Sequence, residues 1–458
     1  MQKKSVLLIF AMILVISVFL VACGGNKVNE SANQNPKENQ KENQKEKTSD
    51  EKVDLVWITH SPETEEEREL YQVDIVDAFE AAHPNVTVKW VEAQDSYALI
   101  RQQLAAGAGP DIISTGGPTF LGEYVNSGYL LPLDPYVEQY KWNERFYDWA
   151  LEAGKIGDKV YGLPGSFETL LVWYNKGMFA ENGWEIPTTY DELVALSEAA
   201  QAKKIMPFAF GASDFRTVNE WWLSSVYNAY VGPKELKEVL QGNVSFESAL
   251  MKQATETYVD MWQKGYINNK QSHAISMEDA WGLFNNNQAA MKLEGTWALS
   301  RLQNDPPPFD TGFFEMPSWR DGVDANLPIG LGDAIGINAK TKHPELAAQL
   351  LDFIYSTTRA EKLTKLGQFQ PMNGLDVAGV EGIDPLVVQV YDRMNGMLNE
   401  GNAGYVSWTY FPPSALSYLW NNIDAVFLEQ MSVNEYLKGT QEAAAKDKEK
   451  NMLFNFAD

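Results

Sequence analysis

Three short runs decide the fold of this chain: VDLVWIT at residues 53–59, VTVKWV at 86–91 and DIIST at 111–115. The first is apolar throughout, as in a buried strand, and the second alternates like a half-buried strand. Residues 65–82 and 97–106, which lie between these runs, have helical spacing of their apolar positions. Strands that alternate with helices predict an α/β fold with a mostly parallel sheet and right-handed crossovers.

The same pattern predicts where a ligand binds. In open α/β sheets, ligands lie beyond the carboxyl ends of the strands. Residues 59–62, 94–97 and 114–119 follow or flank the three strand ends, so we expect binding residues there.

Composition limits the class of protein. The chain has 458 residues, 45% of them hydrophobic, which is enough for two domains or one large one. Its single cysteine excludes an intramolecular disulfide. Of the net charge of -25, Lys3 and Lys4 contribute +2 and residues 24–52 are neutral, so the body from residue 53 carries -27. Such a surface argues against nucleic acid and anionic lipid as ligands.

The N-terminal segment predicts export. Lys3 and Lys4 precede an apolar run over 6–22, and Leu20-Val21-Ala22-Cys23 resembles a bacterial lipoprotein box. We therefore expect a signal peptide over 1–22 and a lipid such as palmitate on Cys23, which places the body on the outer face of the cell membrane. An uncleaved membrane anchor is the alternative, since a spanning helix needs about 20 apolar residues.

The segment after the cysteine is expected to be a tether. Residues 23–52 begin with the lipidated cysteine and are otherwise rich in Asn, Lys, Glu, Gln and Ser, without an aromatic residue. Such a composition cannot bury enough apolar surface to offset chain entropy, so we expect disorder. A flexible chain of this length spans roughly 30 Å.

Several longer motifs carry a family resemblance. They include HPNVTVKW at 83–90, QQLAAGAGPDIIS at 102–114, DKVYGLPGSFETLLVWYNKGMF at 158–179, FNNNQAAMKLEGTW at 284–297 and IGLGDAIGINAKTKHPELAAQLLDFIYS at 329–356. In this order the chain resembles the extracellular solute-binding proteins of carbohydrate ABC transporters, a group related to maltose-binding protein. The resemblance covers the chain from about Val53 to its C-terminal end.

The resemblance implies a periplasmic-binding-protein-like α/β fold, with two lobes, a ligand cleft between them and crossing hinge strands. The expected first lobe takes 53–163 and 308–367, and the second takes 164–307 and 368–458. The chain is expected to cross near 162–168, 304–311 and 369–373. Pro306, Pro307 and Pro308 fit the second crossing, because consecutive prolines cannot extend a helix.

A sugar cleft needs flat aromatic platforms for the apolar face of the ring and polar groups for its hydroxyls. The resemblance implies such a platform at Trp297, which follows Glu294 at the end of an expected strand; core packing against the next helix is the alternative. Trp221 and Trp222 are adjacent on an expected helix and face different ways, so at most one reaches the cleft.

The other candidates lie at strand ends, crossings and loops. Gly332 permits close approach of backbone to ligand because it has no side chain. Trp408 and Tyr410 fall in a stretch, 404–413, that we expect to be an irregular exposed loop. The remaining candidate ligand-binding residues are Trp57, His60, Tyr97, Thr115, Phe167, Glu168 and Asp333. None of these positions is Arg or Lys, which favours a neutral sugar over a phosphate.

The sequence therefore predicts capture without chemistry: a monomer that binds a sugar or oligosaccharide and delivers it to ABC permease subunits served by a cytoplasmic ATPase. We expect no catalytic residue, no metal site, no cofactor and no nucleic acid partner. The alternative is an exported carbohydrate-active enzyme, which needs two carboxyl groups about 5–10 Å apart. A lipid-anchored adhesin or sensor is a third possibility. Neither a Gly-x-Ser-x-Gly elbow nor a His-x-x-x-His pair occurs in the sequence.

Overall fold

The computed structural model describes residues 52–62, 64–214, 218–267 and 274–456. The chain divides into two units, 1–50 and 51–458. The expected signal peptide, the lipid site at Cys23 and nearly all of the tether lie outside the described residues. Within the described part, no helix is both long enough and apolar enough to span a membrane.

The first lobe is built on a five-stranded sheet. β1 pairs in parallel with β2 and with β3, as the alternating pattern predicted, while β12 runs antiparallel to β3 and β6. The strand order is β2-β1-β3-β12-β6. The strands are β1 (Val53–His60), β2 (Val86–Ala93), β3 (Ile112–Ser114), β6 (Leu163–Pro164) and β12 (Ala334–Ile337).

Helices cover this sheet and bury a core around Leu55, Ile75, Phe79, Ile112 and Leu351. The stretch expected to be one helix over 65–82 is helical throughout, with a π-helical segment in its middle. The hairpin of β4 (Lys155–Ile156) and β5 (Lys159–Val160) also belongs to this lobe. The helices are α1 (Glu65–Glu69), η1 (Leu70–Asp77), α2 (Ala78–Ala82), α3 (Ser96–Ala105), η2 (Pro118–Phe120), α4 (Leu121–Asn126), α5 (Asp134–Tyr140), α6 (Trp142–Arg145), α7 (Asp148–Glu152), α15 (Pro344–Ile354) and α16 (Thr357–Lys365).

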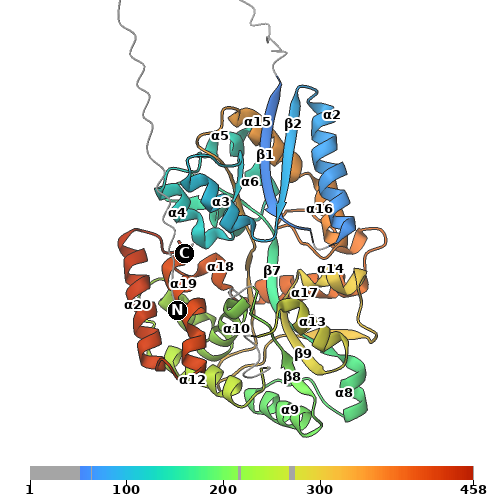
Figure 1. Cartoon of the computed structure of the whole chain (residues 1–458), viewed down its shortest axis with the longest axis vertical. Helices are drawn as coiled ribbons and strands as arrows, with labels where there is room; N and C mark the ends of the chain where they lie inside the picture. The colour runs from blue at the N-terminus through green and yellow to red at the C-terminus, as the bar shows by residue number, and fades with distance from the viewer. Residues whose placement is uncertain (1–51, 63, 215–217, 268–273, 457–458) are drawn as a thin grey trace, which may run out of the picture. The chain divides into compact units, whose positions relative to one another are not determined.

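The second lobe is built on a six-stranded sheet with β7 at its centre. β7 pairs antiparallel with β9, β10 and β11, β8 pairs in parallel with β9, and β13 pairs in parallel with β11. Figure 1 draws β7, β8 and β9 in the lower part of the molecule and β1 and β2 in the upper part. The strands are β7 (Phe167–Asn175), β8 (Met206–Ala209), β9 (Ala289–Gly295), β10 (Thr311–Phe314), β11 (Leu327–Leu331) and β13 (Ala403–Tyr405).

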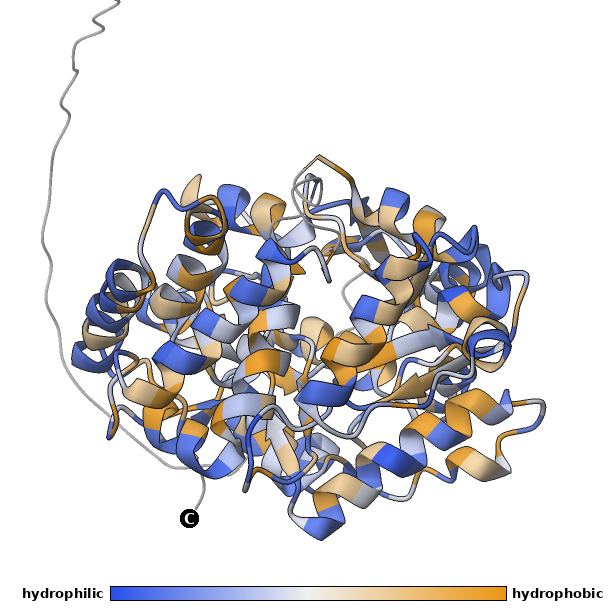
Figure 2. Ribbon diagram, turned by 90° about the horizontal axis from the view of Figure 1, so that it is seen from below, coloured by the Kyte–Doolittle hydropathy of each residue, from blue (hydrophilic) through white to orange (hydrophobic). Residues whose placement is uncertain are grey.

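The second lobe holds the larger hydrophobic core, which includes Trp222, Tyr227, Tyr258 and Phe411. Hydrophobic and hydrophilic residues alternate along the helices, as two-faced helices on a core require (Figure 2). The helices are α8 (Lys176–Asn182), α9 (Tyr190–Ala202), α10 (Asn219–Val231), α11 (Pro233–Leu240), α12 (Ala249–Gln263), α13 (Met277–Asn285), α14 (Ala298–Asn304), η5 (Val377–Gly379), α17 (Pro385–Glu400), α18 (Ser407–Tyr410), α19 (Pro413–Phe427) and α20 (Val433–Glu449).

The chain passes between the two sheets at β6–β7, as expected near 162–168, and at β11–β12. The crossing expected near 304–311 is wrong, because β10 and β11 both pair with β7 in the second sheet. Residues 308–331, expected in the first lobe, therefore extend the second. The three prolines end α14 but do not mark a change of lobe.

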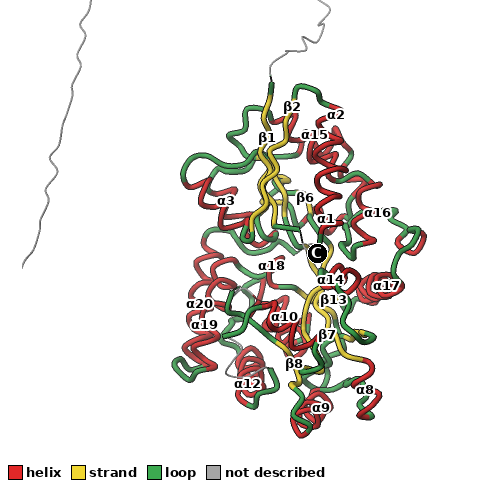
Figure 3. Tube along the Cα trace, turned by 45° about the vertical axis from the view of Figure 1, so that its right-hand side comes forward, coloured by secondary structure: helices red, strands yellow, loops and turns green. Residues whose placement is uncertain are grey.

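The crossing segments are hydrogen-bonded side by side. Gly165 N donates to Asp333 O over 2.8 Å, and Gly332 N donates to Ser166 O over 3.0 Å. Phe167 N donates to Phe369 O over 2.9 Å, which brings in the third crossing near 369–373. Figure 3 shows the two groups of strands, one above the other. We expect hinge motion at the crossing segments that join them.

Candidate functional site

A cavity of about 290 Å³ opens beside the crossing segments. Its wall comes from the first lobe, from the crossings and, through Glu168 and Trp297, from the second lobe. A larger cavity of about 410 Å³ lies elsewhere on the first lobe, around Asp111 and Lys340, and is lined by none of the predicted site residues. We assign the candidate site to the cavity at the crossings because buried polar groups from several elements converge there.

Two carboxyl groups stand at the outer part of this cavity. The Tyr97 hydroxyl donates to Asp333 Oδ1 over 2.5 Å, and His60 meets the Tyr97 ring edge-on with 4.4 Å between centroids. Ser166 Oγ donates to Glu168 Oε1. These bonds fix the carboxyl groups of Asp333 and Glu168 on neighbouring crossing segments.

Two glycines leave room for these closely packed carboxyl groups. A Cβ atom at Gly332 would lie 2.3 Å from Glu168 Oε1, and one at Gly165 would lie 2.7 Å from the Asp333 Cβ. A side chain at either glycine would therefore displace a carboxyl group. Gly332 serves here to admit the neighbouring side chain, and the direct approach of its backbone to a ligand stays a prediction.

Burial changes the protonation of this cluster. Desolvation raises the pKa of Glu168 to about 7, while the bond from Ser166 and the nearby Trp408 oppose the rise. Desolvation also raises the pKa of Asp333 against the opposing effects of Tyr97 and His60. The pKa of Glu220, which is buried behind Glu168, rises to about 8. The raised pKa values favour the protonated carboxyl group, which can donate as well as accept hydrogen bonds, and this suits hydroxyl ligands.

Trp297 contributes the aromatic part of the wall, and a buried chain of contacts holds it. Its Nε1 donates to Glu294 Oε1 over 2.7 Å, and Glu294 Oε2 pairs with Lys292 Nζ over 2.5 Å. Lys292 and Glu294 are only 3% and 2% exposed, and they share one face of β9 because they are two residues apart. Gly295 leaves room for the ring, since a Cβ there would lie 2.1 Å from it.

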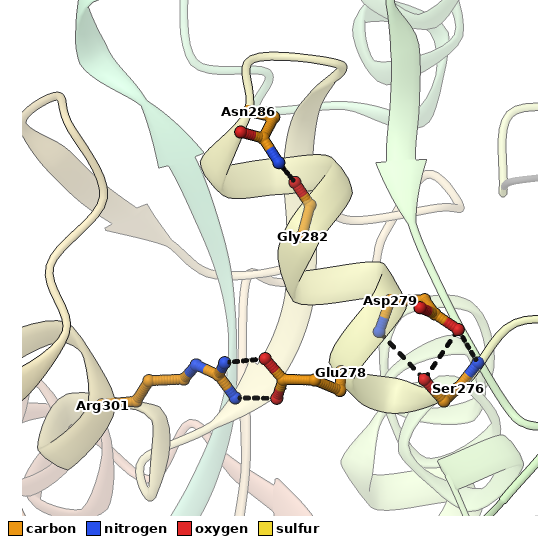
Figure 4. Close-up of polar contacts among 6 residues, drawn as sticks. All are labelled: Ser276, Glu278, Asp279, Gly282, Asn286 and Arg301. Atoms are coloured by element: carbon orange, nitrogen blue, oxygen red, sulfur yellow. Dashed lines mark hydrogen bonds and ion pairs between the residues drawn. The ribbon is translucent and has the colours of Figure 1, made fainter.

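The helix that follows Trp297 is also fixed. α14 carries Arg301, whose guanidinium binds both carboxylate oxygens of Glu278 on α13, over 2.7 and 2.5 Å (Figure 4). α13 is itself held at its start by a reciprocal capping box between Ser276 and Asp279. Trp297 is thus anchored through its own indole and through the helix beyond it.

Two further tryptophans back this wall. The Trp297 ring lies 5.1 Å from Trp221 and 6.0 Å from Trp408, centroid to centroid. At this point η2 of the first lobe meets α18, where the Thr119 hydroxyl donates to Phe411 O over 2.7 Å. Trp408 and Trp221 support Trp297 but are not themselves part of the cavity lining.

Of the residues predicted from the sequence, Trp57, His60, Glu168, Trp297 and Asp333 line the cavity. Tyr97, Glu294, Trp221, Trp408 and Gly332 contact these or lie directly behind them.

The four remaining predicted residues also do not line it. The Thr115 hydroxyl is buried and donates to Gly117 O, while Phe167 packs among Tyr147, Trp149 and Tyr391. Trp222 stacks on Tyr258 in the core, and Tyr410 packs against Phe454 and Phe456.

The exposed loop expected over 404–413 is wrong. It consists of the end of β13, the helix α18 and the start of α19, and both Trp408 and Tyr410 are buried. Gly404 and Pro413 gave the impression of a loop because they mark the boundaries of short elements. Asn228, on α10, holds this stretch by accepting from Tyr405 N over 2.9 Å.

The inner part of the cavity was not foreseen. It is lined by Tyr71 on η1, by Tyr355 and Arg359 around the start of α16, and by Glu67 and Gln370. The candidate residues include no Arg or Lys, but Arg359 stands in the cavity wall. Among the described residues, no group of three or more His, Cys, Asp or Glu side chains is placed to hold a metal ion.

Comparisons with known proteins agree with this architecture. Residues 61–360 match the family model described as bacterial extracellular solute-binding protein. The multiple sugar-binding protein of Streptococcus mutans is 28% identical over 319 residues, covering 68% of this chain and 72% of that protein. The galactooligosaccharide-binding protein of Bacillus subtilis is 26% identical, covering 61% and 65%. A solved chitin oligosaccharide binding protein superposes with a TM-score of 0.76 at 20% identity, covering 87% of this chain and 99% of that one.

Proposed function

Since the chain belongs to the bacterial extracellular solute-binding protein family, we propose that it is the sugar-capturing component of an ABC importer. It binds a sugar or oligosaccharide in the cavity at the crossing segments and passes it unchanged to the permease subunits, whose transport a cytoplasmic ATPase drives. The family binds solutes and does not convert them, so the carboxyl groups of Glu168 and Asp333 serve as hydrogen-bonding partners.

The observation that carries this proposal is the pairing of Trp297 with two partly buried carboxyl groups, those of Glu168 and Asp333, in one cavity. A pyranose offers an apolar face to an indole and hydroxyls to carboxyl oxygens. The sugar-binding names of two relatives support the same ligand class.

The lobes give the mechanism of capture. An open form exchanges with a closed form by motion at the three crossing segments, and a sugar that touches both lobes shifts the population toward the closed form. The closed form then docks on the permease. We further propose that the protein is a monomer held on the outer face of the membrane by a lipid on Cys23.

A sugar panel tests the function directly. In thermal denaturation, a sugar that binds only the folded protein raises the melting temperature, and calorimetry then gives its affinity. We expect at least one sugar to bind with one-to-one stoichiometry and to be recovered intact after incubation. Cleavage of the sugar, detected by mass spectrometry, would contradict the proposal, and so would the absence of any stabilising sugar.

The anchor needs a separate measurement. Mass spectrometry of protein extracted from the membrane fraction should find Cys23 at the mature N-terminus with lipid attached. An unmodified Cys23 would refute the anchor and leave the sugar-binding function standing.

A further inference from the structure

The inner half of the cavity carries hydrogen-bond donors that the protein does not use. Trp57 Nε1, the Tyr355 hydroxyl and Arg359 Nε are buried and have no hydrogen-bond partner. The three side chains are only 2%, 2% and 5% exposed, and all three line the cavity. Buried polar groups are nearly always paired, so three unpaired donors on one cavity wall indicate a place for acceptor atoms of a ligand.

Arg359 adds a buried positive charge to this wall. Its Nη1 donates to the backbone oxygen of Ile354 over 3.0 Å, and its guanidinium carbon lies 5.0 Å from the Tyr71 ring. In the part of the chain that the structure describes, Arg359 forms no ion pair with a carboxylate. A buried cation without an anion is costly, and a ligand anion would remove that cost.

Glu67 is the acidic group on the same inner wall. Gln368 Nε2 donates to Glu67 Oε1 over 2.7 Å, so this carboxylate is already held by a neighbour. Its negative charge argues against a doubly charged group such as phosphate in the inner half.

The outer and inner halves of the cavity therefore differ in hydrogen-bonding character. The outer half offers the acceptor oxygens of Asp333 and Glu168, and the inner half offers the donors of Trp57, Tyr355 and Arg359. A neutral sugar satisfies the outer half but offers the guanidinium no charged group. A sugar acid satisfies both, with its hydroxyls outside and its carboxylate inside, because a planar carboxylate matches a guanidinium.

We propose that the ligand is an acidic sugar, a hexuronate or an oligosaccharide that ends in one, and that the inner half of the cavity binds its carboxylate. This inference rests on the proposed sugar-binding function and specifies the class of sugar.

Matched pairs of sugars that differ only at C6 test it. Calorimetry on the whole chain would compare D-glucuronate with D-glucose, D-galacturonate with D-galactose, and α-1,4-digalacturonate with α-1,4-galactobiose. We expect the acid in at least one pair to bind about tenfold or more tightly than its neutral partner. Binding of neutral sugars at equal or higher affinity would overturn the carboxylate site and leave sugar capture intact, whereas the absence of binding by every sugar would refute both.

Substitutions in the cavity test whether the preference for an acidic sugar depends on Arg359 and Tyr355. Arg359→Gln should bring the ratio of acid to neutral affinity close to one. Tyr355→Phe removes only the unpaired hydroxyl, preserves the ring in the core, and should lower the ratio several-fold even if Arg359→Gln folds poorly. Lys362→Gln is the matched control, because Lys362 is a cation on the same helix that pairs with Asp74 outside the cavity. An unchanged ratio in both cavity variants would contradict the proposal.

Discussion

Glu220 should make this protein less stable as pH rises, and a single substitution should remove the effect. Glu220 is buried on α10, where Ser407 Oγ donates to its Oε2 over 3.0 Å. Desolvation raises its pKa from 4.5 to about 8, the Ser407 bond opposes the rise and the nearby Glu168 adds to it. Between these two pH values the folded state holds a proton that the unfolded state has released.

The sign and size follow from proton linkage. A raised pKa in the folded state contributes stability that is complete below the unfolded pKa and is lost as pH rises through the folded pKa. The difference between the folded and unfolded pKa of Glu220 corresponds to at most about 5 kcal/mol of unfolding free energy, at about 1.36 kcal/mol per pH unit. Glu220→Gln keeps the shape and an acceptor for Ser407 but cannot ionise, so it should escape this loss.

Urea unfolding at about pH 5 and about pH 8.5 measures the difference. The fall in unfolding free energy between the two pH values should be about 4 kcal/mol larger for the parent chain than for Glu220→Gln. Glu256→Gln, on the exposed face of α12, is the control and should behave like the parent. A difference below about 1 kcal/mol between parent and Glu220→Gln would show that the carboxyl group is solvated in the folded state.

Three more predictions concern the aromatic wall. Trp297→Ala should weaken sugar binding by about tenfold or more, about 1.4 kcal/mol, with little change in melting temperature; calorimetry showing unchanged affinity would remove Trp297 from the site. Gly295→Ala should lower sugar affinity by displacing the Trp297 ring, and unchanged tryptophan fluorescence together with unchanged affinity would count against this. Lys292→Met should lower the unfolding free energy by about 3–5 kcal/mol because it leaves Glu294 buried and unpaired. The double variant Lys292→Met with Glu294→Leu should recover most of that loss in urea titrations, and no recovery would exclude the ion pair as the cause.

Local sequence patterns predicted the first strands and helices of the first lobe. Apolar runs and helical spacing gave strands and helices at 53–59, 86–91 and 97–106, and the structure has β1, β2 and α3 within a few residues of those limits. Hydrophobic periodicity indicates which face of a helix or strand is buried. In these segments the conformation that the periodicity predicts is the conformation that the structure has.

Such local patterns gave wrong predictions where the position of a segment depends on its contacts with residues far away in the sequence. Pro306 to Pro308 end a helix, but whether the chain then changes lobe depends on the pairing of β10 with β7, more than 130 residues earlier in the sequence. Trp408 and Tyr410 likewise looked exposed because glycine and proline flank them. Their burial depends on α10 and on the C-terminal aromatic residues Phe454 and Phe456.

The residues of the cavity also divide into those that could be predicted from the sequence and those that could not. Trp297 and Asp333 follow the ends of β9 and β11, and Glu168 lies at the first crossing, so strand ends together with the family resemblance could identify them from the sequence. Arg359 lies near the start of a short helix in the segment TTRAEK, where charged residues usually face solvent. Its bond to Ile354 O and its packing on Tyr71, which lies nearly 290 positions earlier in the sequence, hold it in the cavity wall. The preference for a neutral sugar rested on strand-end and crossing residues alone, and it did not take into account Arg359, which lines the same cavity from a helix packed behind them.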